Sequence, residues 1–148
     1  MKAEICFDMS FDPVTNGSVK LEYLPEVNSM HLQWYGILSY DDHKRAAEQT
    51  YEWIRKTGAT RWIGDVNRLT APMSEGIADY IGWQWFPGAV AAGISEKVAV
   101  VKPRLDFILP STMLIAQRIV EMHGETIKSM KIEAFDCMYS AREWMGQD

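Results

Sequence analysis

The stretch EKVAVV at residues 96–101, which stops at Lys102-Pro103, decides the fold class of this chain. It is a compact apolar run without the alternation of a half-buried strand, and such runs are typical of strands covered on both faces in a parallel sheet. We therefore expect residues 96–101 to form a strand at the centre of a sheet that helices cover.

Helical patterns lie on both sides of this strand. Residues 72–86 are predicted to form a helix, because Pro72 pre-sets the φ angle of a first turn and apolar residues follow at helical spacing. Pro87-Gly88 should interrupt that helix. After the strand, Pro110-Ser111-Thr112 opens a further helix, which we expect to end at Gly124.

The N-terminal third has strand patterns. Residues 4–9 and 19–24 are apolar-rich runs separated by a cluster of turn formers at 12–17, so they predict two strands with a turn between them. Residues 29–38 contain an apolar and polar alternation with a period of two, as expected for a half-buried strand.

The segment that follows predicts a helix and a short strand. Ser39 can cap a helix that Gly58 ends, with acidic residues in its first turn. Residues 60–63 are rich in strand formers and end at Gly64-Asp65. We expect this short strand to deliver Asp65 and Asn67 to a loop at its C-terminal end.

A strand at 127–135 and a capped helix at 136–145 complete the predicted order β-β-β-α-β-α-β-α-β-α. The prediction is therefore an α/β fold: a mixed, largely parallel sheet with antiparallel N-terminal strands and about four helices. At 148 residues, the chain fits a single domain over residues 1–148.

Composition excludes several classes of function. With 15 basic and 20 acidic residues, the net charge is −5, and the chain has none of the Lys/Arg clusters of a nucleic-acid-binding protein. The two cysteines and three histidines have no metal-ligand spacing, so we expect neither a metal site nor a cofactor. The acidic N-terminus and the lack of a long uncharged apolar run favour a cytoplasmic protein without direct membrane insertion.

The order of elements and several short motifs resemble the STAS-like domains, in particular the stand-alone bacterial SpoIIAA-like proteins, whose fold is close to that of lipid-transfer domains. The resemblance runs from about Leu21 to Met145. It rests on the strand at 30–35 before a long helix, an Asp-x-x-x-Leu segment at 65–69 and a Trp-Phe-Pro segment at 85–87, followed by Gly93 and the strand at 97–101. The resemblance implies a regulatory or ligand-binding module without chemistry of its own.

The resemblance also implies a site of phosphorylation. In the related anti-sigma antagonists, a serine at the start of the helix after the Asp-bearing strand is phosphorylated to switch partner binding. Ser74 is the nearest match by position and Thr70 the next, although the expected Asp-Ser pair is absent. A phosphate near a helix N-terminus is favoured by free N–H groups and by the helix dipole.

Two groups of residues are candidates for ligand binding. Asp65, Asn67 and Arg68 would form a polar site at the strand end, where α/β sheets usually bind ligands, unless Asp65 only pairs with Arg68 or caps the backbone. A second group, Trp83, Trp85 and Phe86, with Trp62 and Tyr80 nearby in sequence, would line an apolar pocket, unless it forms core or a dimer contact.

These candidates leave three hypotheses. The first is a non-catalytic STAS-like module that binds a partner protein or a small apolar or amphipathic ligand. The second is a small enzyme with a polar site at Asp65 and Arg68, and the third is a structural homodimer with an aromatic interface.

Overall fold

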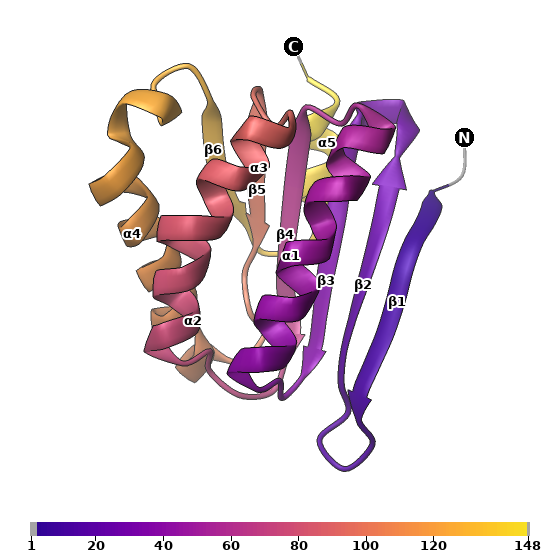
Figure 1. The fold of residues 1–148 in the computed structure, drawn as a ribbon, viewed down its shortest axis with the longest axis vertical. Coiled ribbons are helices and arrows are strands. Elements are labelled where there is room, and N and C mark those ends of the chain that lie inside the picture. The colour runs from indigo at the N-terminus through magenta and orange to yellow at the C-terminus, as the bar shows by residue number, and fades with distance from the viewer. Residues whose placement is uncertain (1–2, 148) are drawn as a thin grey trace.

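The computed structural model describes residues 3–147. Its strands follow the chain order in a six-stranded sheet, β1-β2-β3-β4-β5-β6 (Figure 1). The strands are β1 Glu4–Asp12, β2 Gly17–Leu24, β3 Ser29–Gly36, β4 Arg61–Leu69, β5 Lys97–Val101 and β6 Lys131–Phe135. The helices are α1 Tyr40–Thr57, α2 Glu75–Tyr80, α3 Phe86–Ala92, α4 Leu109–Ile127 and α5 Met138–Met145. A π-helical turn, Ile81–Trp85, joins α2 to α3.

The sheet is antiparallel from β1 to β3 and parallel from β3 to β6. The predicted α/β class, with a mixed and largely parallel sheet, is therefore confirmed. The apolar strand β5 lies between β4 and β6. It is largely buried as predicted, but it lies one strand in from the β6 edge rather than at the sheet centre.

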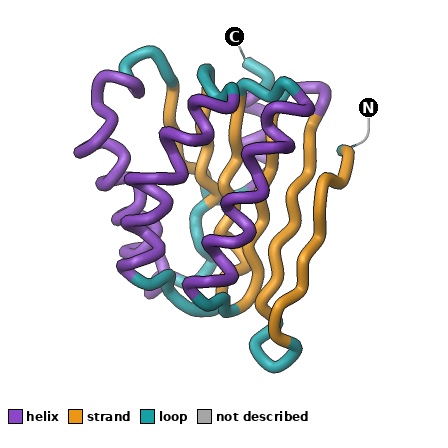
Figure 2. Tube along the Cα trace, viewed as in Figure 1, coloured by secondary structure: helices purple, strands orange, loops and turns teal. Residues whose placement is uncertain are grey.

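Helices cover the two faces of the sheet unequally. α1 to α4 lie on one face, and α5 packs on the other face against β4, β5 and β6 (Figure 1). Each face has its own cluster of buried side chains: Leu21, Met30 and Phe86 belong to the first, and Ile63 and Met145 belong to the second. Figure 2 shows the turn between β1 and β2 projecting beyond the helical layer.

The predicted boundaries of α1 are confirmed. The Ser39 side chain accepts a hydrogen bond from the backbone N–H of Asp42, at 3.1 Å. Gly58 ends the helix in the left-handed conformation, with φ 71°, which glycine adopts without steric cost.

The predicted break at Pro87-Gly88 is wrong. The helix continues from α2 through the π turn into α3 and ends at Gly93, with φ 142°. Proline cannot donate a helical hydrogen bond, and the wider π turn, which ends at Trp85 two residues before Pro87, accommodates this missing donor. Gly88 is required by packing, since a Cβ there would lie 2.7 Å from the Tyr51 ring of α1.

The predicted end of the next helix at Gly124 is also wrong. α4 continues to Ile127 across a kink at His123, whose φ of −132° is not helical. The strand that we expected from residue 127 therefore begins only at Lys131.

The strand before the second helix is longer than predicted. β4 runs from Arg61 to Leu69, so Asp65, Asn67 and Arg68 lie within the strand and not in a loop after it. Gly64, which was expected to end the strand, is accommodated because the Trp62 indole lies over it. A Cβ on Gly64 would be 3.4 Å from the indole nitrogen of Trp62.

Candidate ligand-binding cavity

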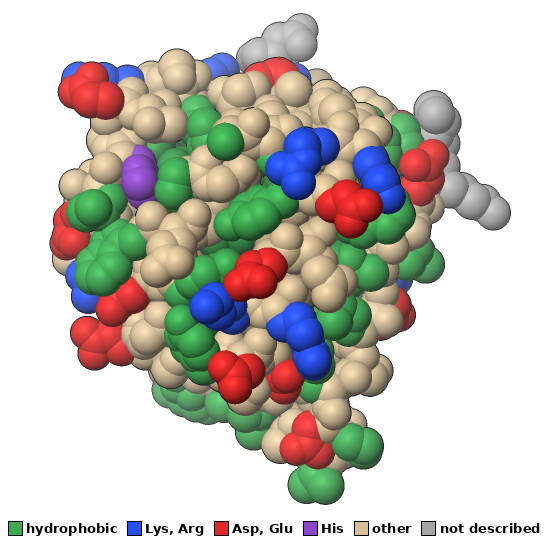
Figure 3. All heavy atoms as spheres, viewed as in Figure 1, with side chains coloured by type: hydrophobic (Ala, Val, Ile, Leu, Met, Phe, Trp, Pro, Cys, Tyr) green, Lys and Arg blue, Asp and Glu red, His purple; other side chains and the backbone are tan. Residues whose placement is uncertain are grey.

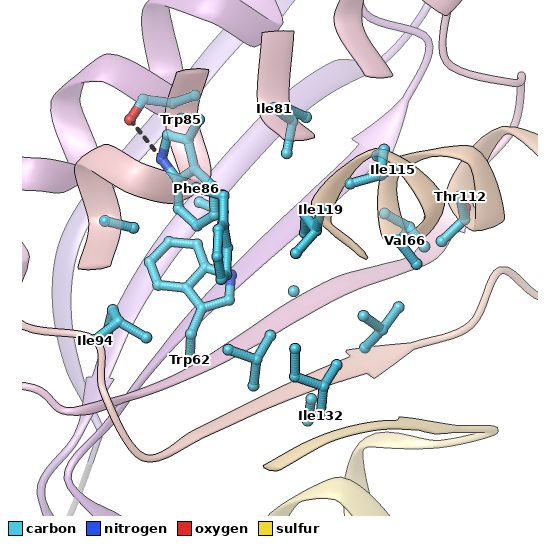
Figure 4. A pocket seen from close by; sticks show the side chains of 18 of the residues that line it. Trp62, Val66, Ile81, Trp85, Phe86, Ile94, Thr112, Ile115, Ile119 and Ile132 are labelled. Atoms are coloured by element: carbon cyan, nitrogen blue, oxygen red, sulfur yellow. Dashed lines mark hydrogen bonds between the residues drawn. The ribbon is translucent and has the colours of Figure 1, made fainter. Parts of the chain in front are cut away.

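A cavity of about 330 Å³ lies between the sheet and the helices on its α1–α4 face (Figure 4). Its floor comes from the cavity-facing side chains of β4, β5 and β6, and its walls come from the π turn, α3 and α4. The lining residues include Trp62, Gly64, Val66, Ile81, Trp85, Phe86, Ile94, Val98, Val100, Thr112, Ile115, Ile119 and Ile132. Nearly all of these side chains are apolar.

The cavity exists because α4 packs on its neighbouring helices and not closely on the sheet. α4 contacts α2 and the π turn, and Gly82 allows its close approach, since a Cβ on Gly82 would lie 2.4 Å from the Cβ of Arg118. Arg118 also donates a hydrogen bond from Nε to the Asp79 carboxylate, at 2.8 Å. These contacts attach α4 along one side only.

The inward face of α4 is consequently only half-buried. Ile115 and Ile119 point toward the sheet but border the cavity, and Thr112 is the buried residue of this helix. Val120 of α4 and Ile132 of β6 also line the cavity, and they are 59% and 39% exposed. The cavity therefore opens to solvent between α4 and β6.

One wall is aromatic and firmly held. The rings of Trp62 and Trp85 pack in a tilted arrangement, with their centroids 4.7 Å apart. The indole N–H of Trp85 donates to the Thr50 hydroxyl at 2.9 Å and to the Ala47 carbonyl at 3.2 Å. Phe86 completes the wall (Figure 4). These bonds fix the Trp85 ring and make this wall rigid.

The predicted aromatic group divides between this cavity and the surface. Trp85 and Phe86 line the cavity, whereas Trp83 is 40% exposed, and the Arg118 guanidinium lies over its ring at 5.2 Å. Closeness in sequence had grouped the three, and the structure separates them because neighbouring residues in a helical turn point in different directions.

The predicted polar group of Asp65, Asn67 and Arg68 does not line this cavity. Trp62, Gly64 and Val66 line the cavity, and the alternation of a strand directs Asp65 to the opposite face, where Ile63 packs in the α5 cluster. Arg68 is exposed. The structure therefore does not bring Asp65 together with Trp85 and Phe86.

Asp65 has partners of its own on that face. One carboxylate oxygen lies 2.9 Å from Nε2 of His31, and the other accepts the backbone N–H of Asn67 at 3.0 Å. Among the described residues, no ion pair links Asp65 to Arg68. The Asn67 side chain donates to the carbonyl of Lys102 at 3.2 Å. Asp65 is thus a buried, partnered carboxylate in the sheet.

Further polar side chains continue this arrangement across β3 and β2. The Tyr35 hydroxyl donates to the Gln33 side chain, which in turn donates to the Glu22 carboxylate, each at 2.6 Å. Lys20 lies 3.4 Å from Glu22. Burial raises the pKa of the Tyr35 hydroxyl above its usual value. The result is a network of partnered polar groups on this face of the sheet.

The two candidate phosphorylation residues lie on the surface. Ser74 is exposed and caps α2, where its side chain accepts the backbone N–H of Ile77 at 3.2 Å. Thr70 is also exposed, directly after β4. Both hydroxyls are therefore accessible, and Ser74 already serves as a helix cap.

Sequence reasoning named Trp62 beside the aromatic group, and it missed Thr112 and the isoleucines of α4 as cavity residues. The apolar pattern predicted the helix that carries Ile115 and Ile119, and it did not indicate that these two side chains border a cavity. A helical pattern shows which face turns inward, and it does not show how far the helix stands from its neighbours. The distance between α4 and the sheet is a tertiary property.

Charge on the surface is mixed. On the face that Figure 3 shows, acidic and basic side chains are interspersed with hydrophobic ones, without a patch of a single sign. Among residues 3–147, no three His, Cys, Asp or Glu side chains gather as metal ligands do. None of the helices in the same range has both the length and the apolar character needed to cross a membrane.

Comparisons of the chain with protein-family models, with curated proteins and with solved structures found no significant match.

Proposed function

We propose that this chain is a non-catalytic binding module of the STAS-like type, which holds a small apolar or amphipathic ligand between the sheet and α4. The observation that carries the proposal is the apolar cavity of about 330 Å³. Its volume lies at the lower end of the range typical of small-molecule sites. Its mouth between α4 and β6 gives a ligand a route in.

The form of the cavity supports binding rather than incomplete packing. Trp85 is held by two hydrogen bonds, and α4 is held by Arg118, so the walls are rigid on both sides of the space. Protein interiors are otherwise close-packed, and a void of this size is costly unless a ligand fills it.

The alternative of an enzyme at Asp65 and Arg68 has less support. Asp65 is 9% exposed and is satisfied by His31 and by a backbone N–H. Arg68 is exposed and does not pair with it. A general acid or base needs access to a substrate, and Asp65 lacks that access.

The test is binding of the neutral fluorescent probe N-phenylnaphthylamine. Ile115→Trp should fill the cavity and weaken probe binding by roughly tenfold or more, because the indole occupies the ligand's volume. Met113→Trp on the same helix is the matched control, since Met113 is 59% exposed and points away from the cavity. Equal probe binding by wild type and Ile115→Trp would overturn the proposal.

A further inference from the structure

The last strand of the sheet, β6, has a free edge on the side away from β5 (Figure 1). Within residues 3–147 it pairs with β5 alone, in parallel. The exposed residues of this strand are Lys131, Ile132, Glu133 and Ala134. A free strand edge presents unpaired backbone N–H and C=O groups, which favour pairing with another strand. The β6 edge is therefore a surface to which a further strand can be added.

The strand at the opposite edge of the sheet, β1, is shaped differently. Its pairing with β2 is irregular at two points, between Ile5 and Phe7 and between Ser10 and Asp12. Bulges of this kind are one of the ways in which proteins keep an edge strand from pairing further. The register of β6 with β5 is continuous along the whole strand. Of the two edge strands, β6 is thus the one with a regular backbone to offer.

The backbone hydrogen bonds of β6 show which of its residues face the free edge. The N–H of Lys131 donates to the carbonyl of Glu96 at 3.0 Å. The carbonyl of Phe135 accepts the N–H of Lys102 at 2.8 Å. Because Glu96 and Lys102 flank β5, both bonds point to the β5 side. Backbone groups of successive strand residues point alternately to the two sides, so Ile132 directs its N–H and C=O to the free edge.

The charged side chains on the two sides of Ile132 have opposite signs. Ile132 lines the cavity, so the alternation of a strand directs Lys131 and Glu133 to the other face of the sheet. Neither charge forms an ion pair with another residue in the range 3–147. If two copies of this strand pair antiparallel about Ile132, Lys131 of each copy lies opposite Glu133 of the other. The segment is thus complementary in charge to itself.

Other symmetric registers do not match the charges. Two-fold axes at Lys131 or at Glu133 place a charge opposite its own copy, which is unfavourable. An axis at Ala134 places Glu133 opposite the ring of Phe135. An axis at Ile132 pairs opposite charges at two points. It also lets the two Ile132 residues exchange both of their backbone hydrogen bonds, as in the hydrogen-bonded pairs of an antiparallel ladder.

We propose that two copies of this chain associate by antiparallel pairing of β6 about Ile132, which joins their two sheets into one. Lys131 of each copy lies opposite Glu133 of the other on one face. On the other face, Ile132 is 39% exposed at the mouth of the cavity, and Ile132 of the second copy packs beside it there. This inference goes beyond the proposed function and holds whether the cavity is empty or filled.

The test is sedimentation velocity of the full chain at concentrations from about 5 to 500 µM. Wild type should change from monomer to dimer over this range. Lys131→Glu and Glu133→Lys each place like charges opposite one another at two points of the symmetric interface. Each should therefore weaken the dimer roughly tenfold or more. Glu52→Lys is the matched control for net charge, because Glu52 is exposed on α1, and it should stay within about twofold of wild type.

Two combinations of these substitutions test the register. An equimolar mixture of the Lys131→Glu chain and the Glu133→Lys chain should form dimers within about threefold of wild type, because each chain supplies the charges that the other needs. The double variant, with both substitutions in one chain, reverses the two charges and should dimerise alone to a similar extent. The substituted side chains are exposed, so the variants should fold, and circular dichroism verifies it.

Three results would overturn the proposal. The first is a wild-type chain that stays monomeric at about 500 µM. The second is a dimer that neither Lys131→Glu nor Glu133→Lys weakens more than Glu52→Lys does. The third is a mixture of the two single variants that stays as monomeric as each variant alone, since pairing about Ile132 requires the mixture to dimerise.

Discussion

The indole N–H of Trp85 donates to the hydroxyl of Thr50 at 2.9 Å, and this bond joins the aromatic wall of the cavity to α1. Trp83, two residues earlier, is exposed. Trp85→Ala should lower the free energy of unfolding by about 3–5 kcal/mol, because it removes a large buried side chain. Trp83→Ala, the matched control, should cost about 1 kcal/mol or less. Denaturant unfolding measures both, and equal costs would contradict the assignment of Trp85 to the wall.

Substitutions of Gly82 and Gly124 test whether the close contact between the π turn and α4 holds this helix in place. A Cβ on Gly82 would lie 2.4 Å from the Cβ of Arg118, whereas a Cβ on Gly124 would meet nothing within 4 Å. Gly82→Ala should therefore destabilise the protein by about 1–3 kcal/mol and alter probe affinity, because α4 must shift. Gly124→Ala should be neutral or stabilising by up to about 1 kcal/mol. If Gly82→Ala matches Gly124→Ala in thermal unfolding and in probe titration, α4 is not held at this contact.

A substitution of Asp65 tests whether the polar network and the cavity, which lie on opposite faces of the sheet, are independent. Asp65→Asn disturbs the bond to His31 and should lower the free energy of unfolding by about 1–3 kcal/mol. Affinity for N-phenylnaphthylamine should stay within about twofold of wild type, because the cavity lies on the other face. A large loss of probe affinity in a variant that remains folded would show that Asp65 contributes to the ligand site.

Burial of the His43 side chain predicts that the stability of the protein depends on pH. His43 is buried, its Nε2 has no hydrogen-bond partner among the described residues, and its ring packs on Trp34 with the centroids 4.8 Å apart. Desolvation by burial lowers its pKa from 6.5 to about 4, and the nearby Ser39 backbone and Asp42 offset this only in part. The neutral form is therefore the one that fits the fold.

Because the folded-state pKa of His43 is the lower one, the unfolded chain takes up the proton first as the pH falls. Stability should be unaffected by this group above about pH 6.5 and should decrease between about 6.5 and 4, by about 3 kcal/mol in total. His43→Phe keeps a ring against Trp34 and should flatten this part of the profile, as followed by urea unfolding at each pH. An unchanged slope in His43→Phe would assign the effect to other groups.

The order of strands and helices could be predicted from local patterns. The apolar run at 96–101, the cap at Ser39 and the stop at Gly58 each reflect local physics, and the structure confirms them. The errors at Pro87 and Gly64 arose where packing overrode a local signal: a π turn accommodates the proline, and the Trp62 indole covers the glycine.

The candidate site could be predicted only in part. The sequence suggested Trp85 and Phe86 as pocket residues, with core or a dimer contact as the alternative, and both side chains are buried and line the cavity. It could not show that Asp65 faces away, because the extent of β4 decides the direction of that side chain. Nor could it identify the part that α4 plays in the lining, which depends on the space that this helix leaves above the sheet.

The central claim, an apolar ligand between α4 and β4, is tested most directly by a crystal structure of the protein grown with 10-bromodecanol. We predict ligand density in the cavity, with the anomalous bromine peak between α4 and β4. A structure at saturating ligand in which the cavity holds no bromine, with α4 packed onto the strands, would contradict it.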